Sequence, residues 1–190
     1  MPLPRFAVVD VETSGLSDRR HRILQLGAVI IEADGTVIDQ WSTLVRLRWP
    51  LQSVGPTHIH GLTRPMLRGA PRLSTALDQL APLLDGAIFT AHNAQFDAGF
   101  IVRAAHRRAG FELGPQLCTL RMSRQLDPDR QMSHRLVDVA ERYGVDLTPP
   151  HDALADAAAT AAVLPHLLAA HHIVEPEQLD PFFVGSKRPQ

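Results

Sequence analysis

The sequence predicts an α/β fold in which helices flank a mixed, five-stranded sheet. Three observations support this class. Residues 6–9, Phe-Ala-Val-Val, form a continuous apolar run that is typical of a central strand covered on both faces. Asp34-Gly35 is a hairpin signal between two further apolar segments, so antiparallel strands come first. In the second half of the chain, helical stretches alternate with short apolar strands, which completes a mixed sheet.

The first half is expected to hold three antiparallel strands. The opening apolar run gives a strand over 5–11, and a second apolar segment covers 23–32. Alternating apolar positions over 36–47 give the third strand, because the Asp34-Gly35 turn joins it to the second. A loop over 50–56 then leads into a short helical region over 57–63.

Helices and strands alternate in the second half. Ser74 can cap a helix that ends at Asp85-Gly86, Gly110 can stop a second helix, and Ser133 can cap a third. Pro149-Pro150 precede a last, alanine-rich helix. In chain order, we expect a helix over 74–84, a strand over 87–91, a helix over 95–109, a brief strand over 116–119, and helices over 119–126, 134–143 and 152–171.

The composition limits the class of protein. A chain of 190 residues that is 45% hydrophobic is long enough for one well-buried domain and short for two. Its single cysteine, Cys118, excludes an intramolecular disulfide and a cysteine zinc site, which suits a reducing cytoplasm. We find no apolar stretch of about 18 residues and no basic and hydrophobic signal segment, so we expect a cytoplasmic protein without membrane contact.

Arginine dominates the basic residues. The net charge of -1 gives no global attraction to nucleic acid, yet 18 of the 19 basic residues are Arg, whose planar guanidinium binds phosphate in bidentate fashion. A solvated helix face is the commoner explanation of any one group, so the groups indicate a binding site only if they rim one cleft. The groups are Arg19, Arg20 and Arg22; Arg64, Arg68 and Arg72; Arg103, Arg107 and Arg108; and Arg121 and Arg124.

Two carboxylates at the end of the first strand form a candidate cation site. Asp10 and Glu12 are two residues apart, so in an extended strand both side chains project from the same face. The plain alternative is a buried strand that runs into a solvated turn. Acids at the tip of a strand covered on both faces are partly desolvated and repel one another, so they favour a compensating Mg²⁺ or Mn²⁺.

Further acids and one histidine occupy comparable places. Asp97 follows the fourth strand in the first turns of a helix, where an acid is also favoured by the helix dipole alone. If the first and fourth strands are neighbours, Asp97 faces Asp10. Five residues on a continuous helix would turn His151 and Asp156 about 140° apart, so we place His151 just before the helix, Asp152 at its N-cap and Asp156 on its face. Four acids and a histidine together are what two-metal hydrolysis of a phosphodiester requires.

The motifs that carry these residues resemble the DEDDh family of 3′ to 5′ exonucleases, which includes the epsilon proofreading subunit of the bacterial replicative DNA polymerase. Residues 10–16 (DVETSGL) resemble the first motif, residues 92–97 (HNAQFD) the second, and His151 with Asp156 the third. A histidine five positions before the last aspartate distinguishes this branch from the branch that uses a tyrosine. Residues 134–144 resemble the helix before the third motif, and residues 57–63 resemble the loop beside the substrate pocket. The fold implied is ribonuclease H-like.

The resemblance implies a role for each motif residue. Two Mg²⁺ (or Mn²⁺) ions would be bound by Asp10, Glu12, Asp97 and Asp156, and His151 would accept a proton from the attacking water. His92 would only orient the second motif. The terminal nucleotide would contact Thr13, Ser14, Gly15, Leu16 and His60, with Asn93 and Phe96 supporting the pocket.

The substrate implied by the resemblance is a nucleic acid with a free 3′ end, from which nucleoside 5′-monophosphates are released. We expect single-stranded or frayed DNA to be favoured over RNA, in proofreading or repair. A chain with 5% aromatic residues has little material for an extended stacking platform, so a short 3′ single strand fits best. The motifs leave open an exoribonuclease that trims RNA or short oligoribonucleotides. The alternative from another class is a catalytically silent nucleic-acid-binding or polymerase-associated module.

The chain is expected to divide into an exonuclease domain over residues 1–173 and a C-terminal tail over 174–190. The tail contains Gln178-Leu179-Asp180-Pro181-Phe182-Phe183, which resembles the short peptide by which bacterial replication proteins dock on the sliding clamp, as a polymerase-associated protein would. Pro181 stands where that pattern commonly has leucine. The favoured alternative is that Phe182 and Phe183 fold back over an apolar patch.

Overall fold

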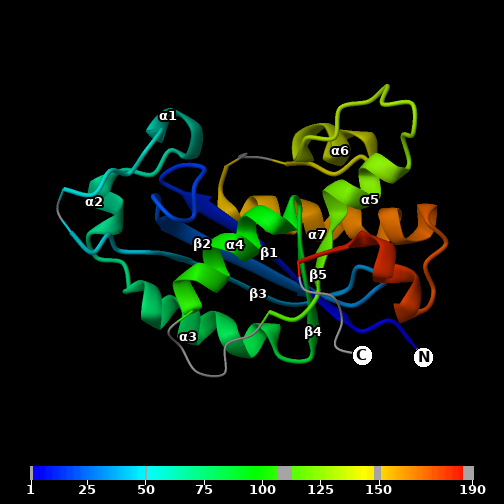
Figure 1. The fold of residues 1–190 in the computed structure, drawn as a ribbon, viewed down its shortest axis with the longest axis horizontal. Helices are drawn as coiled ribbons and strands as arrows, with labels where there is room; N and C mark the ends of the chain where they lie inside the picture. Colours follow the sequence, from blue (N-terminus) through cyan, green and yellow to red (C-terminus); the bar gives the residue numbers. More distant parts are fainter. Residues whose placement is uncertain (1, 50, 107–112, 148–150, 186–190) are drawn as a thin grey trace.

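The computed structural model describes residues 2–49, 51–106, 113–147 and 151–185, which form one mixed sheet with helices packed around it (Figure 1). The strand order is β3-β2-β1-β4-β5-β6. The strands are β1 (Arg5–Thr13), β2 (Ile23–Ile31), β3 (Val37–Leu44), β4 (Ala87–Ala91), β5 (Gln116–Cys118) and β6 (Phe183–Val184). The helices are α1 (Thr57–His60), α2 (Arg64–Leu67), α3 (Leu73–Leu84), α4 (Ala94–Ala105), α5 (Thr119–Gln125), α6 (Leu136–Arg142), α7 (Ala153–Ala170) and the 3₁₀ helix η1 (Pro176–Phe182).

The pairing of the strands confirms the predicted mixed sheet. β1 pairs antiparallel with β2, and β2 pairs antiparallel with β3. β1 also pairs parallel with β4, and β4 with β5, so the first and fourth strands are neighbours. The sheet has one strand more than predicted, because β6 pairs antiparallel with β5 at the edge. Two residues after a 3₁₀ helix carry no periodic signal, which is why the sequence did not predict this strand.

Alternating side chains of β1 serve two hydrophobic cores. Val9 and Val11 pack into the core under α3 and α4. Phe6 and Val8 point to the opposite face and pack against α5, α6 and α7. Asp10 and Glu12 continue the Phe6 and Val8 series, since side chains two apart share a face. The two carboxylates therefore emerge on the α7 side of the sheet, where the apolar core ends.

Some predicted helix boundaries are wrong. Ser74 lies inside α3, whose N-cap is Arg72, and Ser133 lies before α6, whose N-cap is Arg135. The Ser133 hydroxyl instead donates a hydrogen bond to the Asp138 carboxylate. A serine near a helix start has several local acceptors, so the pattern alone could not fix the register. The predicted end of the fourth helix near Gly110, the arginines at 107 and 108, and the Pro149-Pro150 pair lie outside the described residues.

The last described segment packs on the domain. In η1, Leu179 and Phe182 are buried in the core that contains α7, and the His171 ring lies 4.5 Å from the Phe182 ring, centroid to centroid. Helix α7 is the one helix within the described residues that is long and apolar enough to cross a membrane by length and composition. The sequence was expected to contain no apolar stretch of about 18 residues, and this helix contains one. However, 50% of the stretch is buried inside the structure, as in the core helix of a folded domain.

Candidate active site

The end of β1 is held close to the start of α7 by a glycine. Gly27 of β2 lies opposite Asp10, and a Cβ atom placed there would lie 2.2 Å from the Ala153 carbonyl oxygen. Any larger residue would therefore push the first turn of α7 off the sheet. A β-bulge at Glu12/Thr13 then turns the chain away from the ladder. The close approach brings the carboxylates of β1 and those of α7 to one place.

Asp97 reaches the same place from α4. Helix α4 starts after Asn93, whose φ of 77° is in the left-handed region. The Asp97 carboxylate is buried and accepts a hydrogen bond of 3.2 Å from the backbone N–H of Val11, between Asp10 and Glu12. The parallel pairing of β1 and β4 confirms the condition under which the sequence placed Asp97 opposite Asp10.

His151 and Asp156 flank the first turn of α7. His151 has a φ of 63° and precedes the helix, and Asp152 is the N-cap, accepting hydrogen bonds from the N–H groups of Leu154 and Ala155. Both predicted positions are confirmed. One ligand atom from each of Glu12, His151 and Asp156 lies within 4.8 Å of the others. The ligand atoms of one octahedral Mg²⁺ lie at most about 4 Å apart, so these three atoms would have to approach one another slightly to share an ion.

Gln25 anchors this turn, and sequence reasoning missed it. Its side-chain amide donates a hydrogen bond of 2.8 Å to the Asp152 carboxylate, and its carbonyl oxygen accepts one of 3.4 Å from the N–H of Ala153. Gln25 lies opposite Glu12 in the β1–β2 ladder. The signal that could have found it is a polar residue in the otherwise apolar strand Ile23–Ile31.

The carboxylates raise one another's pKa values. Burial raises the pKa of Asp10 well above its usual range, and the nearby carboxylates of Asp97, Asp156 and Glu12 raise it further. Burial and the carboxylates of Asp156 and Asp152 raise the pKa of Glu12 to about 7. Burial likewise raises the pKa values of Asp97 and Asp156. Because the four acids lie close together and are buried, their charged forms are disfavoured.

This donor set fits divalent cations. Oδ1 of Asp156 is buried and, within the described part of the chain, has no hydrogen-bond partner. An orphaned carboxylate oxygen beside three further acids is satisfied by a cation, and carboxylate oxygens are the ligands that Mg²⁺ and Mn²⁺ prefer. Asp10, Glu12, Asp97 and Asp156 could hold such ions, and His151 stands at their edge.

The residues predicted to line the nucleotide pocket differ in their surroundings. Ser14 accepts a hydrogen bond from the Arg22 N–H and Thr13 donates one to the Gly15 carbonyl, so both brace the loop after β1. Leu16 projects from this loop with 86% of its surface exposed, free to contact a base. His60 is buried, and its ring nitrogens bond to Val54 and Leu62 of its own loop.

The two other predicted pocket residues belong to the start of α4. Asn93 is exposed, and Phe96 is half-buried with its ring centroid 5.1 Å from that of Phe100.

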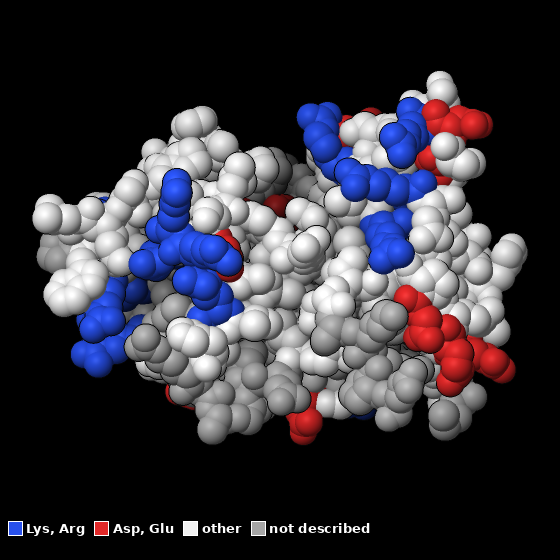
Figure 2. Space-filling view, viewed as in Figure 1, with Lys and Arg blue, Asp and Glu red and all other residues white. Residues whose placement is uncertain are grey.

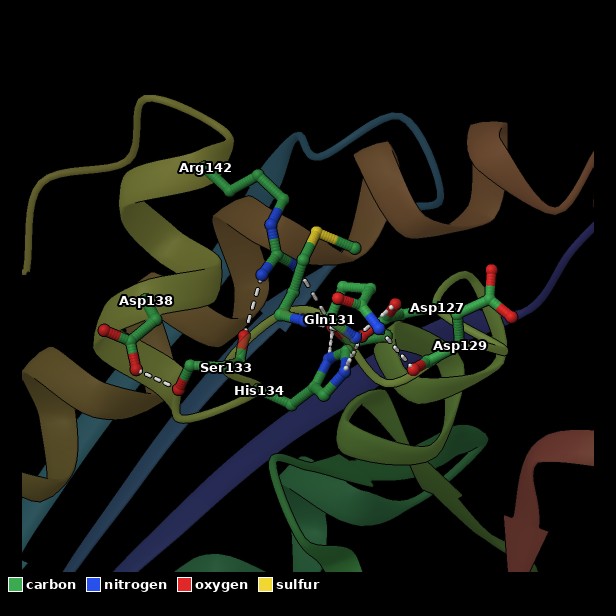
Figure 3. A network of polar contacts seen from close by, with 9 residues as sticks. Asp127, Asp129, Gln131, Ser133, His134, Asp138 and Arg142 are labelled. Atoms are coloured by element: carbon green, nitrogen blue, oxygen red, sulfur yellow. Dashed lines mark hydrogen bonds and ion pairs between the residues drawn. The ribbon is translucent and has the colours of Figure 1, made fainter.

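The segment between α5 and α6 carries a polar network that includes Asp127, Ser133 and His134 (Figure 3), and His92 is bonded to it. His92, at the end of β4, contacts the hydroxyl of Thr119 at 3.0 Å and the carbonyl of His134 at 2.9 Å. The His134 ring contacts the carboxylate of Asp127 at 3.1 Å. Burial lowers the pKa of His92, which favours the uncharged ring in these hydrogen bonds. The geometry agrees with an orienting role.

Comparison with known proteins gives one family. Residues 7–164 match the model of the RNase_T family, described as exonuclease. The chain is 36% identical over 162 residues to DNA polymerase III PolC-type of Lacticaseibacillus paracasei, which covers 84% of this chain and 11% of that protein. It is 37% identical over 164 residues to the same protein of Staphylococcus haemolyticus, covering 83% and 11%. The chain thus spans about a tenth of these relatives.

Solved structures share the fold. Exonuclease X in complex with 5′ overhanging duplex DNA has a TM-score of 0.69 at 25% identity, over 94% of this chain and 98% of that one. Exonuclease I has a TM-score of 0.76 at 19% identity, over 94% and 43%. The nuclease domain of 3′hExo, described as a DEDDh family member bound to rAMP, has a TM-score of 0.72 at 13% identity, over 90% and 94%.

Proposed function

Because the chain belongs to the RNase_T family of exonucleases, we propose that it removes nucleotides from the 3′ end of single-stranded or frayed DNA and releases nucleoside 5′-monophosphates. The observation that carries the proposal is the convergence of Glu12, His151 and Asp156 within 4.8 Å, with Asp97 bonded to the backbone between Asp10 and Glu12. Each of the five positions carries the residue that the chemistry needs, which disfavours a catalytically silent module.

The cofactor we propose is a pair of divalent cations, Mg²⁺ or Mn²⁺, held by Asp10, Glu12, Asp97 and Asp156. When bound, such ions supply Lewis acids for the attacking water and for the phosphate that is cut. The four carboxylates supply the opposing charge, and their raised pKa values mean that ionisation and metal binding are coupled. Protons leave the site as the ions enter it.

In this proposal, His151 takes up the proton of the water. Its imidazole is exposed and lies at the edge of the carboxylates. A ring nitrogen accepts the proton as the water oxygen bonds to phosphorus and the bond to the leaving 3′ oxygen breaks, and that oxygen takes a proton from solvent. Exposure then lets the imidazolium lose that proton to solvent. The left-handed backbone at His151 and the Asp152 cap fix the ring beside the helix rather than on it.

DNA is the substrate we favour over RNA. The relatives are named as DNA polymerases, and the solved structure of Exonuclease X at 25% identity holds duplex DNA. We also propose a role in proofreading beside a polymerase. The reason is that the chain resembles a segment, 11% of the length, of proteins named as DNA polymerases. An exoribonuclease is the alternative. We place the activity in the bacterial cytoplasm, where such relatives replicate DNA.

The tail is better explained as part of the domain than as a docking peptide. Leu179 and Phe182, the apolar residues that a clamp would take up, are buried in the core beside α7. We therefore propose that residues 174–185 cover the edge of the exonuclease domain. Saturable binding of a peptide of residues 175–186 to a sliding clamp would favour docking instead.

The test compares substrates side by side. Single-stranded DNA, duplex DNA with a mismatched 3′ end, and RNA, each labelled at the 5′ end, are incubated with Mg²⁺ or Mn²⁺ and resolved by length. We expect the fastest shortening ladder on single-stranded or mismatched DNA. Faster shortening of RNA would reassign the substrate class. Tight binding of 3′ ends without shortening of any of them would support the silent module.

A further inference from the structure

A large basic cavity lies on the α3 and α4 side of the domain. Its volume is about 1010 Å³, at the upper end of the range of about 300–1,000 Å³ for ligand pockets. Its lining comes from four stretches: the loop before β2, the segment after β3, the start of α3 and the end of α4. We call it the arginine cleft, after its lining residues Arg19, Arg22, Arg46, Arg48, Arg72 and Arg103.

No ion pair among the described residues neutralises the arginines of the arginine cleft. Its arginines are exposed, and one carboxylate, Asp18, stands among the described lining residues. The ion pairs within the described ranges join Arg5 to Glu32, His134 to Asp127 and Arg135 to Asp138, all outside the cleft. Figure 2 shows blue side chains gathered on this face, with a recessed red patch between two such groups. Six like charges around one cavity attract a polyanion.

An exposed aromatic ring narrows the class of polyanion. Trp49 lines the cleft with 58% of its surface exposed, and the guanidinium carbon of Arg48 lies 5.1 Å from its ring centroid. A basic groove with an open aromatic face is the arrangement that binds nucleic acid strands, because bases stack on the ring while arginines contact phosphates. An acidic protein surface would leave the ring without a stacking partner.

Contacts of its lining residues connect the arginine cleft to the segments around the active site. The backbone N–H of Arg22 donates a hydrogen bond to the Ser14 hydroxyl. The His21 ring packs on Gly15 so closely that a Cβ atom on residue 15 would lie 2.6 Å from the ring. On the other side, Phe100 lines the cleft and its ring contacts that of Phe96, one residue before Asp97. The arginine cleft is therefore linked to the loop after β1 and to the start of α4, the two segments that hold the predicted nucleotide pocket.

We propose that the arginine cleft binds the phosphodiester backbone of the nucleic acid outside the nucleotide that is cleaved. The inference rests on the proposed exonuclease function and deepens it, since the cleft would supply affinity while the carboxylates supply chemistry. The backbone in the cleft is either that of the cleaved strand or that of its complementary strand. Both have the same phosphate chemistry, and the substrates of the test separate them.

The test removes arginines from two walls of the cleft. Arg48→Ala and Arg103→Ala are made singly and together, and Arg5→Ala is the control, because Arg5 is exposed at the opposite end of β1. Binding of fluorescent single-stranded 4-mers and 20-mers, and of a 20-base-pair duplex with a frayed 3′ end, is measured by anisotropy in EDTA over a series of salt concentrations. EDTA prevents cleavage during the titration.

We expect each cleft substitution to weaken binding of the longer substrates about tenfold, the size of one charge-assisted hydrogen bond. The slope of log affinity against log salt should fall by about 0.7 per arginine for single strands and about 0.9 for duplex. An effect on the single-stranded 20-mer assigns the cleft to the cleaved strand, and an effect on the duplex alone assigns it to the complementary strand. Arg5→Ala should bind as the wild type does.

A small substrate separates this proposal from the exonuclease proposal. The p-nitrophenyl ester of thymidine 5′-monophosphate has no neighbouring nucleotides, so its hydrolysis with Mn²⁺ should be the same in the wild type and in the cleft variants. If the wild type does not hydrolyse the ester, the exonuclease function is refuted, whatever the cleft binds. Unchanged affinities and salt slopes in the cleft variants, with ester hydrolysis intact, would overturn the proposal for the cleft alone.

Discussion

Gly27→Ala tests whether the close approach of β2 to α7 sets the catalytic geometry. The added Cβ would lie 2.2 Å from the Ala153 carbonyl oxygen and 2.6 Å from the Leu154 nitrogen, where ordinary contact begins at 3.4 Å. Backbone atoms cannot swing aside as a flexible side chain can. The first turn of α7 must therefore move by about 1 Å, and His151 and Asp156, on either side of Ala153, move with it.

A displacement of this size should cost more activity than stability. Misplacement of catalytic groups by 1 Å lowers the rate by about 100-fold, whereas overpacking a core costs about 1–3 kcal/mol of folding free energy. The assay is the initial rate of DNA shortening with Mg²⁺, with folding followed by circular dichroism and thermal melting. Gly69→Ala is the control, because nothing lies within 4 Å of its Cβ position. A Gly27→Ala rate within threefold of the wild type would refute the reasoning.

Further predictions concern the charged groups of the site. The raised carboxylate pKa values, including about 7 for Glu12, mean that these groups stabilise the metal-free protein most below about pH 4.5, the ordinary pKa of Glu, and that their contribution is lost as pH rises through 7. Its melting temperature should fall by a few degrees between pH 5 and 8, and Mg²⁺ should reverse the fall; a rise without metal would contradict this. Asp10→Asn should abolish cleavage yet raise the metal-free melting temperature at pH 8, so a lower value there would refute the proposed repulsion. His151→Asn should keep the fold and calorimetric Mn²⁺ binding but lower the rate by about 100-fold or more, and an unchanged pH–rate profile would exclude it as the base. Asp152→Ala should cost about 1 kcal/mol in urea unfolding, and an unchanged midpoint would mean that its N-cap bonds contribute little.

The site residues on local motifs could be predicted because short-range geometry determines their directions. Asp10 and Glu12 share a face in any strand, and His151 had to leave the helix to reach the side occupied by Asp156. The prediction for Asp97 needed one further assumption, that the first and fourth strands are neighbours in the sheet. The parallel pairing of β1 and β4 confirms it.

The residues that hold the motifs together could not be predicted, because their roles depend on contacts far apart in sequence. Gln25 and Asp152 are 127 residues apart, and Gly27 meets Ala153 only after the helix has packed on the sheet. The arginine groups were ambiguous for the same reason, since no local rule brings Arg22, Arg46 and Arg103 to one cavity. Long-range packing decides such contacts, and a single sequence does not encode them in any short pattern.

The proposed active site should cut DNA from its 3′ end when a divalent cation is present. Single-stranded DNA with a 3′-terminal label is incubated with the wild type, in Mg²⁺ and in EDTA, and with Asp10→Asn in Mg²⁺. We expect labelled mononucleotide to be the first product of the wild type in Mg²⁺, and we expect neither of the other two reactions to release it. Release of that mononucleotide in EDTA or by Asp10→Asn, or a first product that is a longer labelled fragment, would contradict this expectation.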